Sequence, residues 1–312
     1  MAKFKGVREA FAAALTDLVA DGVDAYGVFP DSLSAMRAVA FGEKYPTHYV
    51  ECGIAEQCAV DVAAGMATTG AIPFVGSYAG FLTMRAGEQM RTFVGYTNLN
   101  VKFAGFNAGC MGGEREGVTH QFYEDIAFVS SLPNFKIFAP ADGNQMYKAV
   151  KLAAELQGPI YLRGGSGKEP TVFAEDAPFS LDGITICKDF GTDAAIFSTG
   201  HVLDRVIAAA DMLKDKGINV IAADINILYG ENSAKILETM AKVPLVVTVE
   251  DHNINGGLGS YISRLATENK PVLVKRIALE DYSESGPAKE LGDKEGFSPE
   301  NITAVVSKCL GK

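Results

Sequence analysis

Short apolar runs alternate with amphipathic stretches along this chain, and the alternation begins twice. In the first half the strand-like runs are residues 24–30, 47–52, 72–78, 101–107 and 159–163, and the helix-like stretches are residues 7–20, 53–67 and 143–156. In the second half the strand-like runs are residues 194–200, 218–225, 244–251 and 271–278, and the helix-like stretches are residues 201–217, 233–243 and 256–269. This pattern predicts β-α-β units that build parallel sheets.

The two halves are separated by residues 164–183, which are rich in glycine, proline and acidic residues and show no period. Such composition is typical of a loop or linker. A chain of 312 residues also has the length of about two domains. We therefore predict two consecutive open parallel-sheet α/β domains, residues 1–166 and 189–312, joined by a linker at residues 167–188.

Composition excludes several functional classes. The 38 acidic against 28 basic residues give a formal charge of −10, which argues against nucleic acid or an anionic membrane as a partner. No stretch approaches the ~20 apolar residues that span a bilayer, and the amino terminus lacks the features of a secretory signal. Five scattered cysteines without a C-x-x-C pair indicate a reduced, cytoplasmic setting, and four dispersed histidines predict no metal cluster.

One acidic residue stands at the start of an otherwise small and apolar helix. Apolar side chains recur there every four residues, at Ile54, Cys58, Val62 and Met66, and alanines widen the stripe. The pattern predicts a helix that is buried on a broad face. Glu56, on its first turn, is either a solvated partner of the helix dipole or a buried acid that faces a specific group.

Three further places along the chain carry candidate binding or catalytic residues. Tyr78 and Phe81 lie three residues apart just after a strand-like run, where two aromatics form either core or a cofactor platform. His120 follows a glycine-rich stretch and precedes a helical pattern, and ligands of open α/β sheets bind at such junctions. Arg163 ends a strand and enters a glycine-rich turn, which suits a phosphate or carboxylate, or an ion pair with an internal acid.

Five stretches carry a family resemblance: GIAEQ, GSYAGF, EREGVTHQFYEDIAFVSSLPNFKIFAPADGNQ, PIYLR and VVTVEDHNINGGLGS. In this order and at this spacing they resemble the carboxy-terminal half of transketolases, thiamine-diphosphate enzymes that move two-carbon ketol units between sugars. The resemblance extends from about Phe11 to the end of the chain. It implies a domain that binds the cofactor's aminopyrimidine ring, followed by a smaller α/β domain with no direct catalytic role.

The resemblance also implies cofactor-binding residues. Glu56 resembles the family's catalytic glutamate, which hydrogen-bonds the pyrimidine nitrogen N1′, and this role requires that the carboxyl group be shielded from water. Tyr78 and Phe81 resemble the aromatics that contact the pyrimidine, with Phe81 as the ring that stacks on it. Asp31 matches an acid in the family's strand-end loop, where the phosphate-binding serine is either Ser34 or missing.

On the substrate side, the resemblance makes His120 a catalytic residue that exchanges protons near the substrate oxygens. It makes Arg163 the group that binds the sugar phosphate and Glu116 an acid that contacts a substrate hydroxyl. Three positions depart from the family pattern. Met84 replaces a third aromatic, Ala108 replaces a second histidine, and Glu116 stands where aspartate is usual. These departures do not affect the residues that activate the cofactor, but they leave open which sugar is the substrate.

The family's metal-binding motif is missing from this chain. That motif, G-D-G followed by asparagine, belongs to the amino-terminal half, and the nearest matches at residues 141–145 and 291–296 have the wrong spacing. We therefore expect no metal on this chain and a separate subunit that binds the diphosphate with Mg²⁺ or Ca²⁺. The expected assembly is a homodimer of this chain within a heterotetramer, acting on sugar phosphates in pentose phosphate metabolism.

Other functions remain open. A subunit of a thiamine-dependent 2-oxo-acid dehydrogenase has the same two-domain plan, although GVTHQ favours transketolase. A deoxyxylulose-phosphate synthase shares the glutamate and the aromatic spacing but is normally one long chain. A non-catalytic subunit that stabilises its partner is the alternative from another class. Residues 255–260, NGGLGS, are weak evidence for nucleotide binding.

Overall fold

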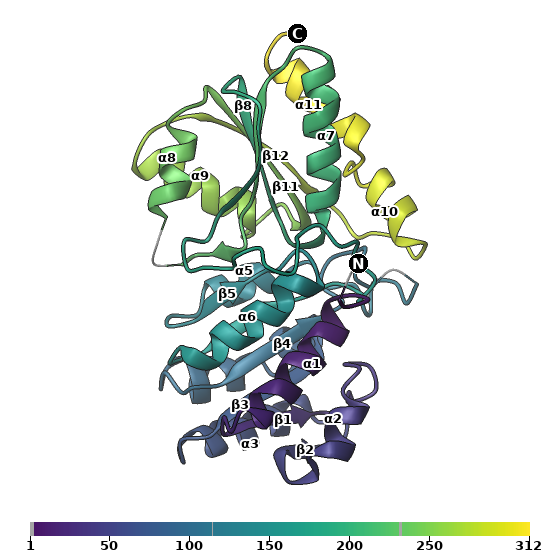
Figure 1. The fold of residues 1–312 in the computed structure, drawn as a ribbon, viewed down its shortest axis with the longest axis vertical. Helices are drawn as coiled ribbons and strands as arrows, with labels where there is room; N and C mark the ends of the chain where they lie inside the picture. The colour runs from purple at the N-terminus through teal and green to yellow at the C-terminus, as the bar shows by residue number, and fades with distance from the viewer. Residues whose placement is uncertain (1–2, 114, 231–232) are drawn as a thin grey trace.

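The computed structural model describes residues 3–113, 115–230 and 233–312 as two α/β domains stacked end to end (Figure 1). The sheet of the first domain has the strand order β10-β5-β6-β4-β3-β1-β2, and that of the second has the order β12-β11-β8-β9-β7. The prediction of two consecutive α/β domains is confirmed. In the described part of the chain, no helix is long and apolar enough to cross a membrane.

The elements of the first sheet and its helices are α1 (Val7–Ala20), β1 (Ala25–Phe29), α2 (Val39–Lys44), η1 (Pro46–His48), β2 (Tyr49–Glu51), α3 (Glu56–Ala67), β3 (Ile72–Tyr78), η2 (Phe81–Arg85), α4 (Gly87–Gln89), η3 (Met90–Gly95), β4 (Lys102–Phe106), α5 (Asp125–Ser130), β5 (Lys136–Phe138), α6 (Gly143–Glu155) and β6 (Ile160–Arg163). The elements that follow are β7 (Thr185–Asp189), β8 (Ala194–Thr199), η4 (Gly200–Val202), α7 (Leu203–Asp215), β9 (Val220–Asp224), β10 (Ile227–Leu228), α8 (Ala234–Met240), β11 (Leu245–Asn253), α9 (Leu258–Glu268), β12 (Leu273–Leu279), α10 (Ala288–Lys294) and α11 (Pro299–Cys309).

Both sheets are parallel except at one edge strand each. In the first sheet β10 runs antiparallel to β5, and in the second β7 runs antiparallel to β9. Residues 164–184 contain no helix or strand, but β7 occupies the end of the predicted linker. Its pattern was weak because an edge strand buries little and this one ends in charged Lys188 and Asp189.

The start of α6 ties the linker to the first domain. One carboxylate oxygen of Asp142 accepts a hydrogen bond from the backbone N–H of Gln145 at 2.9 Å, which caps the helix. Its other oxygen accepts from the N–H groups of Val172 and Phe173 at 2.8 and 2.7 Å. A single aspartate therefore both begins a helix and fixes the chain that leads to the second domain.

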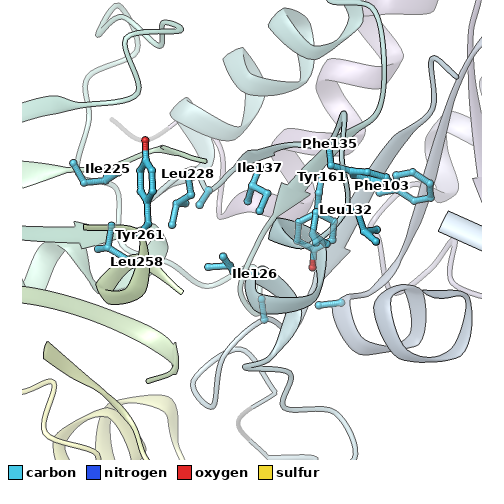
Figure 2. Packing of buried hydrophobic residues seen from close by; sticks show 14 of the residues in the cluster. Phe103, Ile126, Leu132, Phe135, Ile137, Tyr161, Ile225, Leu228, Leu258 and Tyr261 are labelled. Atoms are coloured by element: carbon cyan, nitrogen blue, oxygen red, sulfur yellow. The ribbon is translucent and has the colours of Figure 1, made fainter. Parts of the chain in front are cut away.

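The two domains share one apolar core. Helices α1 and α6 pack together over one face of the first sheet (Figure 1). The apolar core on the opposite face of this sheet continues into the second domain. Figure 2 shows Ile126 and Ile137 in the same cluster as Leu228, Leu258 and Tyr261. Because β10 also extends the first sheet, the domains are joined by both backbone hydrogen bonds and buried apolar surface.

Helix α3 buries only part of the predicted face. Its buried residues are Glu56, Ala59, Val60, Ala63 and Ala64. The predicted stripe of larger side chains is wrong at its first two positions, because Ile54 is 75% exposed and Cys58 is exposed. Small alanines let the helix approach β3 closely. This arrangement leaves Ile54 and Cys58 exposed, whereas Val60 is buried and Met66 packs against the core.

Candidate active site

The rings of three residues predicted for the site lie together at the carboxyl edge of the first sheet. Tyr78 ends β3, Phe81 begins η2, and His120 lies in the loop before α5. The ring centroids are 5.4 Å apart for Tyr78 and Phe81, 5.4 Å for Tyr78 and His120, and 5.3 Å for Phe81 and His120, all in edge-to-face geometry. The structure therefore brings together the predicted pyrimidine platform and the predicted catalytic histidine.

Glu56 lies beside this platform and is only 5% exposed. One of its carboxylate oxygens accepts a hydrogen bond from Nη1 of Arg85 at 3.0 Å. The guanidinium of Arg85 stacks over the ring of Phe81 at 3.6 Å from its centroid. The arginine is about half exposed, so it joins a buried acid and an aromatic face from the solvent side.

A second arginine, which the sequence did not single out, adjoins the rings. Arg8 on the first turn of α1 lies 5.7 Å from the ring of Tyr78 and donates to Asn107 Oδ1. Nδ2 of Asn107 donates to the carboxylate of Glu116 at 2.9 Å. Burial lowers the pKa of Arg8, although the nearby Tyr78, Glu169 and Glu116 oppose this shift. An arginine on an amphipathic helix normally faces solvent, so no periodic signal marked Arg8.

Asp31 lies in the loop after β1, at the same edge of the sheet. Its backbone adopts a left-handed φ of 52°, and its N–H donates to Glu51 Oε1 at 2.7 Å. This hydrogen bond joins the Asp31 backbone to the end of β2, and both Asp31 and Ser34 are exposed. A role of Asp31 in cofactor binding stays a prediction.

The position of Arg163 does not support binding of a substrate phosphate. Its side chain is 2% exposed, and its Nε donates to both carboxylate oxygens of Asp125 at 2.9 and 3.2 Å. Its Nη2 donates to the backbone oxygen of Asp251 in the second domain at 2.8 Å. The second alternative from the sequence, an internal ion pair, therefore describes Arg163, which joins the two domains.

A buried histidine at the same junction predicts acid sensitivity. Nε2 of His252 accepts from the N–H of Ala127 at 3.3 Å, and Nδ1 lies 2.7 Å from the backbone oxygen of Asn253, so the ring is neutral with its proton on Nδ1. Burial lowers the pKa of His252 from 6.5 to about 4 although Asp125 opposes this shift. The unfolded chain thus binds more protons as pH falls, and the group costs about 3 kcal/mol of stability between pH 6.5 and 4.

This effect is measured as the difference in free energy of unfolding between the natural chain and His252→Gln. The natural chain should lose about 3 kcal/mol relative to the variant as pH falls from 6.5 to 4. Glu250, 3.9 Å from His252, has a pKa that burial raises to about 7 and titrates in both proteins, so the comparison largely cancels its contribution. A difference that stays constant across this range would contradict the prediction.

Among residues 3–113, 115–230 and 233–312, no group of three or more histidine, cysteine, aspartate or glutamate side chains is arranged to hold a metal ion. A cavity of about 490 Å³ lies at the domain junction, with His201, Asp204 and Arg205 among its lining residues. None of the residues that the sequence predicts for the site lines this cavity. The candidate active site is therefore the ring cluster with Glu56.

Both domains match known families. The transketolase pyrimidine binding domain matches residues 5–167, and the transketolase C-terminal domain matches residues 184–302. The chain therefore belongs to the transketolase family. It corresponds to the carboxy-terminal subunit of transketolases that are split into two chains.

Relatives of similar length support this assignment. A putative transketolase C-terminal section from Methanocaldococcus jannaschii is 32% identical and covers 99% of this chain and 98% of its own length. One of the subunits of an apulose-4-phosphate transketolase from Phocaeicola vulgatus is 32% identical over 98% of this chain and 97% of its own length. A split-gene transketolase, solved as an inactive β4 tetramer, superposes with a TM-score of 0.88 at 33% identity and covers 98% of each chain.

Proposed function

We propose that this chain supplies the pyrimidine-binding side of a thiamine-diphosphate-dependent transketolase. The enzyme would transfer a two-carbon ketol unit from a ketose phosphate to an aldose phosphate, in the cytoplasm and within pentose phosphate metabolism. The observation that carries this proposal is the buried carboxylate of Glu56 next to the edge-to-face rings of Tyr78, Phe81 and His120. A subunit that only stabilised its partner would not need this arrangement.

The contacts of Arg85 support the fit of the cofactor. Its guanidinium is a planar, nitrogen-bearing group that stacks on Phe81 and donates an N–H to Glu56. An aminopyrimidine ring would use the same stacking face and the same carboxylate. The bound cofactor would supply a carbanion nucleophile, while Glu56 holds a proton at the ring nitrogen and Phe81 orients the ring. Arg85 would have to leave this position.

The Arg85→Ala variant is expected to bind thiamine diphosphate more tightly. Binding in the natural chain must break a stacking contact and a half-exposed ion pair, which together contribute about 1 kcal/mol. Removing the side chain should therefore lower the dissociation constant roughly fivefold, measured by titration of the complex with its partner subunit. Arg91→Ala, an exposed arginine on η3, is the matched control. Weaker binding by Arg85→Ala would contradict the prediction.

On the substrate side, His120 would exchange a proton with the substrate oxygens and Glu116 would accept a hydrogen bond from a sugar hydroxyl. We assign the binding of an anionic substrate group to Arg8 in place of Arg163. Arg8 has a buried Nε without a hydrogen-bond partner among the described residues and lies beside Tyr78. A partly buried guanidinium with a spare donor suits a phosphate oxygen.

The Arg8→Met variant is expected to raise the KM of a phosphorylated ketose roughly tenfold to a hundredfold, because a charge-assisted hydrogen bond contributes about 1.5–3 kcal/mol. The rate with a short unphosphorylated ketol donor should change much less. Steady-state kinetics with both donors measure this, and the free energy of unfolding checks that the fold persists. Equal increases for both donors would rule out a role in phosphate recognition.

The assembly is also a proposal. Large apolar side chains are exposed close to α3 and on the elements that contact it, namely Ile54, Met84, Phe93 and Tyr96. Exposed apolar residues next to an incomplete site suit burial by another subunit. We propose a partner that binds the diphosphate and Mg²⁺ or Ca²⁺, with two copies of each chain in a heterotetramer.

The decisive experiment mixes this chain with the diphosphate-binding subunit, thiamine diphosphate and Mg²⁺. Transfer of a ketol unit from a ketose phosphate to an aldose phosphate is expected, and neither subunit alone should be active. Decarboxylation of a 2-oxo acid with delivery of the product to lipoamide would favour the dehydrogenase alternative. Assembly without any turnover on either substrate class would favour a structural subunit.

A further inference from the structure

Three consecutive residues at the end of β11 are fully buried acceptors of backbone hydrogen bonds. The carboxylate of Glu250 accepts from Leu258 and Gly259 at 2.5 and 2.8 Å, at the start of α9 within the second domain. The next two residues reach into the first domain. Asp251 accepts from two N–H groups, and His252 accepts from that of Ala127.

The Asp251 contacts lie at the beginning of the loop that carries the substrate-side residues. Its Oδ1 accepts from the N–H of Cys110 at 2.8 Å and its Oδ2 from that of Met111 at 3.0 Å. Gly109 precedes them with a φ of +84°, and a Cβ there would lie 2.2 Å from Oδ2 of Asp251. Only glycine therefore allows the backbone to approach the carboxylate this closely.

The end of the same loop is held from the second domain as well. The N–H of Asn253 donates to the backbone oxygen of Tyr123 at 2.6 Å, and the Gln121 side chain donates to the backbone oxygen of Glu284 at 2.7 Å. The base of the loop is closed by a 2.6 Å hydrogen bond from the N–H of Gly109 to the oxygen of Phe122. Both ends of the segment that bears Glu116 and His120 are thus fixed by the second domain.

Asp251 is suited to this task by its charge. Burial alone would raise its pKa, but the hydrogen bond from His201 and the charges of His201 and Arg163 hold that pKa below its usual range. Nε2 of His201 lies 2.8 Å from Oδ2 of Asp251. An ionised carboxylate accepts stronger hydrogen bonds from backbone N–H groups than a neutral one.

We propose that Asp251, oriented by His201, is a positioning residue that helps to fix the loop between Gly109 and Phe122 at both ends, and thereby sets His120 against Tyr78 and Phe81 and Glu116 against Asn107. The second domain then takes part in the reaction through this loop. This inference rests on the proposed function for the roles of His120 and Glu116.

The test compares Asp251→Asn with Glu250→Gln in the complex with the partner subunit. Both changes replace a buried carboxylate that accepts two backbone hydrogen bonds, but Glu250 holds α9 and not the loop. Asp251→Asn should lower kcat roughly tenfold to a hundredfold, because small displacements of reacting groups are costly. Its affinity for thiamine diphosphate should change less than twofold, since Glu56 and Phe81 lie on other elements. Glu250→Gln should leave kcat within about twofold.

A double-mutant cycle separates positioning from general destabilisation. If Asp251 acts through His120, then Asp251→Asn should have little further effect on kcat in the His120→Ala background. Equal losses of kcat in Asp251→Asn and Glu250→Gln, or additive losses in the cycle, would overturn the inference. His201→Gln, which leaves the carboxylate in place, is expected to show the same pattern at smaller amplitude if Asp251→Asn folds poorly.

Amide hydrogen exchange supplies a readout that does not depend on turnover. Asp251→Asn should accelerate exchange at Cys110 and Met111 selectively, with Glu250→Gln affecting Leu258 and Gly259 instead. Faster exchange in the loop together with no ketol transfer by the natural complex would mean that the proposed function fails while the anchoring stands. Unchanged exchange at Cys110 and Met111 would reject the anchoring itself.

Discussion

Replacing Glu56 by alanine is expected to lower the rate of ketol transfer by about 10³-fold, which is the size of effect that loss of a positioned proton donor produces. The residue is buried at the start of α3 and faces the aromatic platform, so no solvent group can take its place. Steady-state rates of the complex with its partner subunit measure the effect. Glu56→Gln, which keeps the shape, should also lose most of the activity because an amide does not titrate.

The control for this prediction is Gln57→Ala. Gln57 is the next residue on the same helix and is exposed, so its removal should change neither rate nor stability appreciably. Cofactor affinity should fall much less than the rate in Glu56→Ala, since Phe81 still offers its ring. Retention of more than about a tenth of the natural rate in Glu56→Ala would show that the carboxylate is not the essential group.

Replacing Arg163 by methionine is expected to destabilise the fold by about 3–5 kcal/mol, because it leaves a buried carboxylate without its cation. The side-chain hydrogen bonds to Asp125 from Arg163 would be lost, and the hydrogen bond from the hydroxyl of Tyr161, at 2.8 Å, would remain. The backbone oxygen of Asp251 would also lose its donor. Chemical denaturation of the purified chain gives the free energy of unfolding directly.

Two comparisons sharpen this second prediction. Lys151→Ala removes a surface ion pair with Asp21 and should cost no more than about 1 kcal/mol. The double variant Arg163→Met with Asp125→Leu should recover part of the loss, because the unpaired charge is removed together with its partner. If Arg163→Met unfolds like the natural chain and only raises the substrate KM, Arg163 binds substrate after all.

The sequence predicted the two-domain α/β fold because buried parallel strands require apolar runs, and β8 and β9 have every residue buried. It missed elements that bury little or are very short, and it assigned no element after residue 278, where α10 and α11 lie. The edge strand β7 looked like linker, and β10 has two residues whose pairing with β5 depends on the other domain. Its prediction for α3 was wrong at Ile54 and Cys58, which are exposed because the helix packs mainly through alanines.

Within the candidate site, the resemblance to transketolases indicated Glu56, Tyr78, Phe81 and His120, and their places at strand ends and helix starts bring them to one edge of the first sheet. Their roles stay predictions. The sequence did not indicate which arginines would lie at this edge. Whether an arginine meets solvent or an internal acid depends on a partner distant in sequence, and Arg163 finds Asp125 38 residues away. Arg8 and Arg85 carry no periodic or motif signal, and only their three-dimensional neighbours indicate a role.

The short strand β10 bears on whether the halves of this chain are separable. It covers the outer edge of β5, so a fragment that ended before the second domain would present unpaired backbone N–H and C=O groups along that edge. Such an edge invites pairing with a second molecule. The same fragment would lose Leu228, Leu258 and Tyr261 from its own core. Cutting the chain between residues 164 and 184 would therefore yield an aggregation-prone fragment rather than an autonomous domain. The intact chain should unfold in a single cooperative thermal transition.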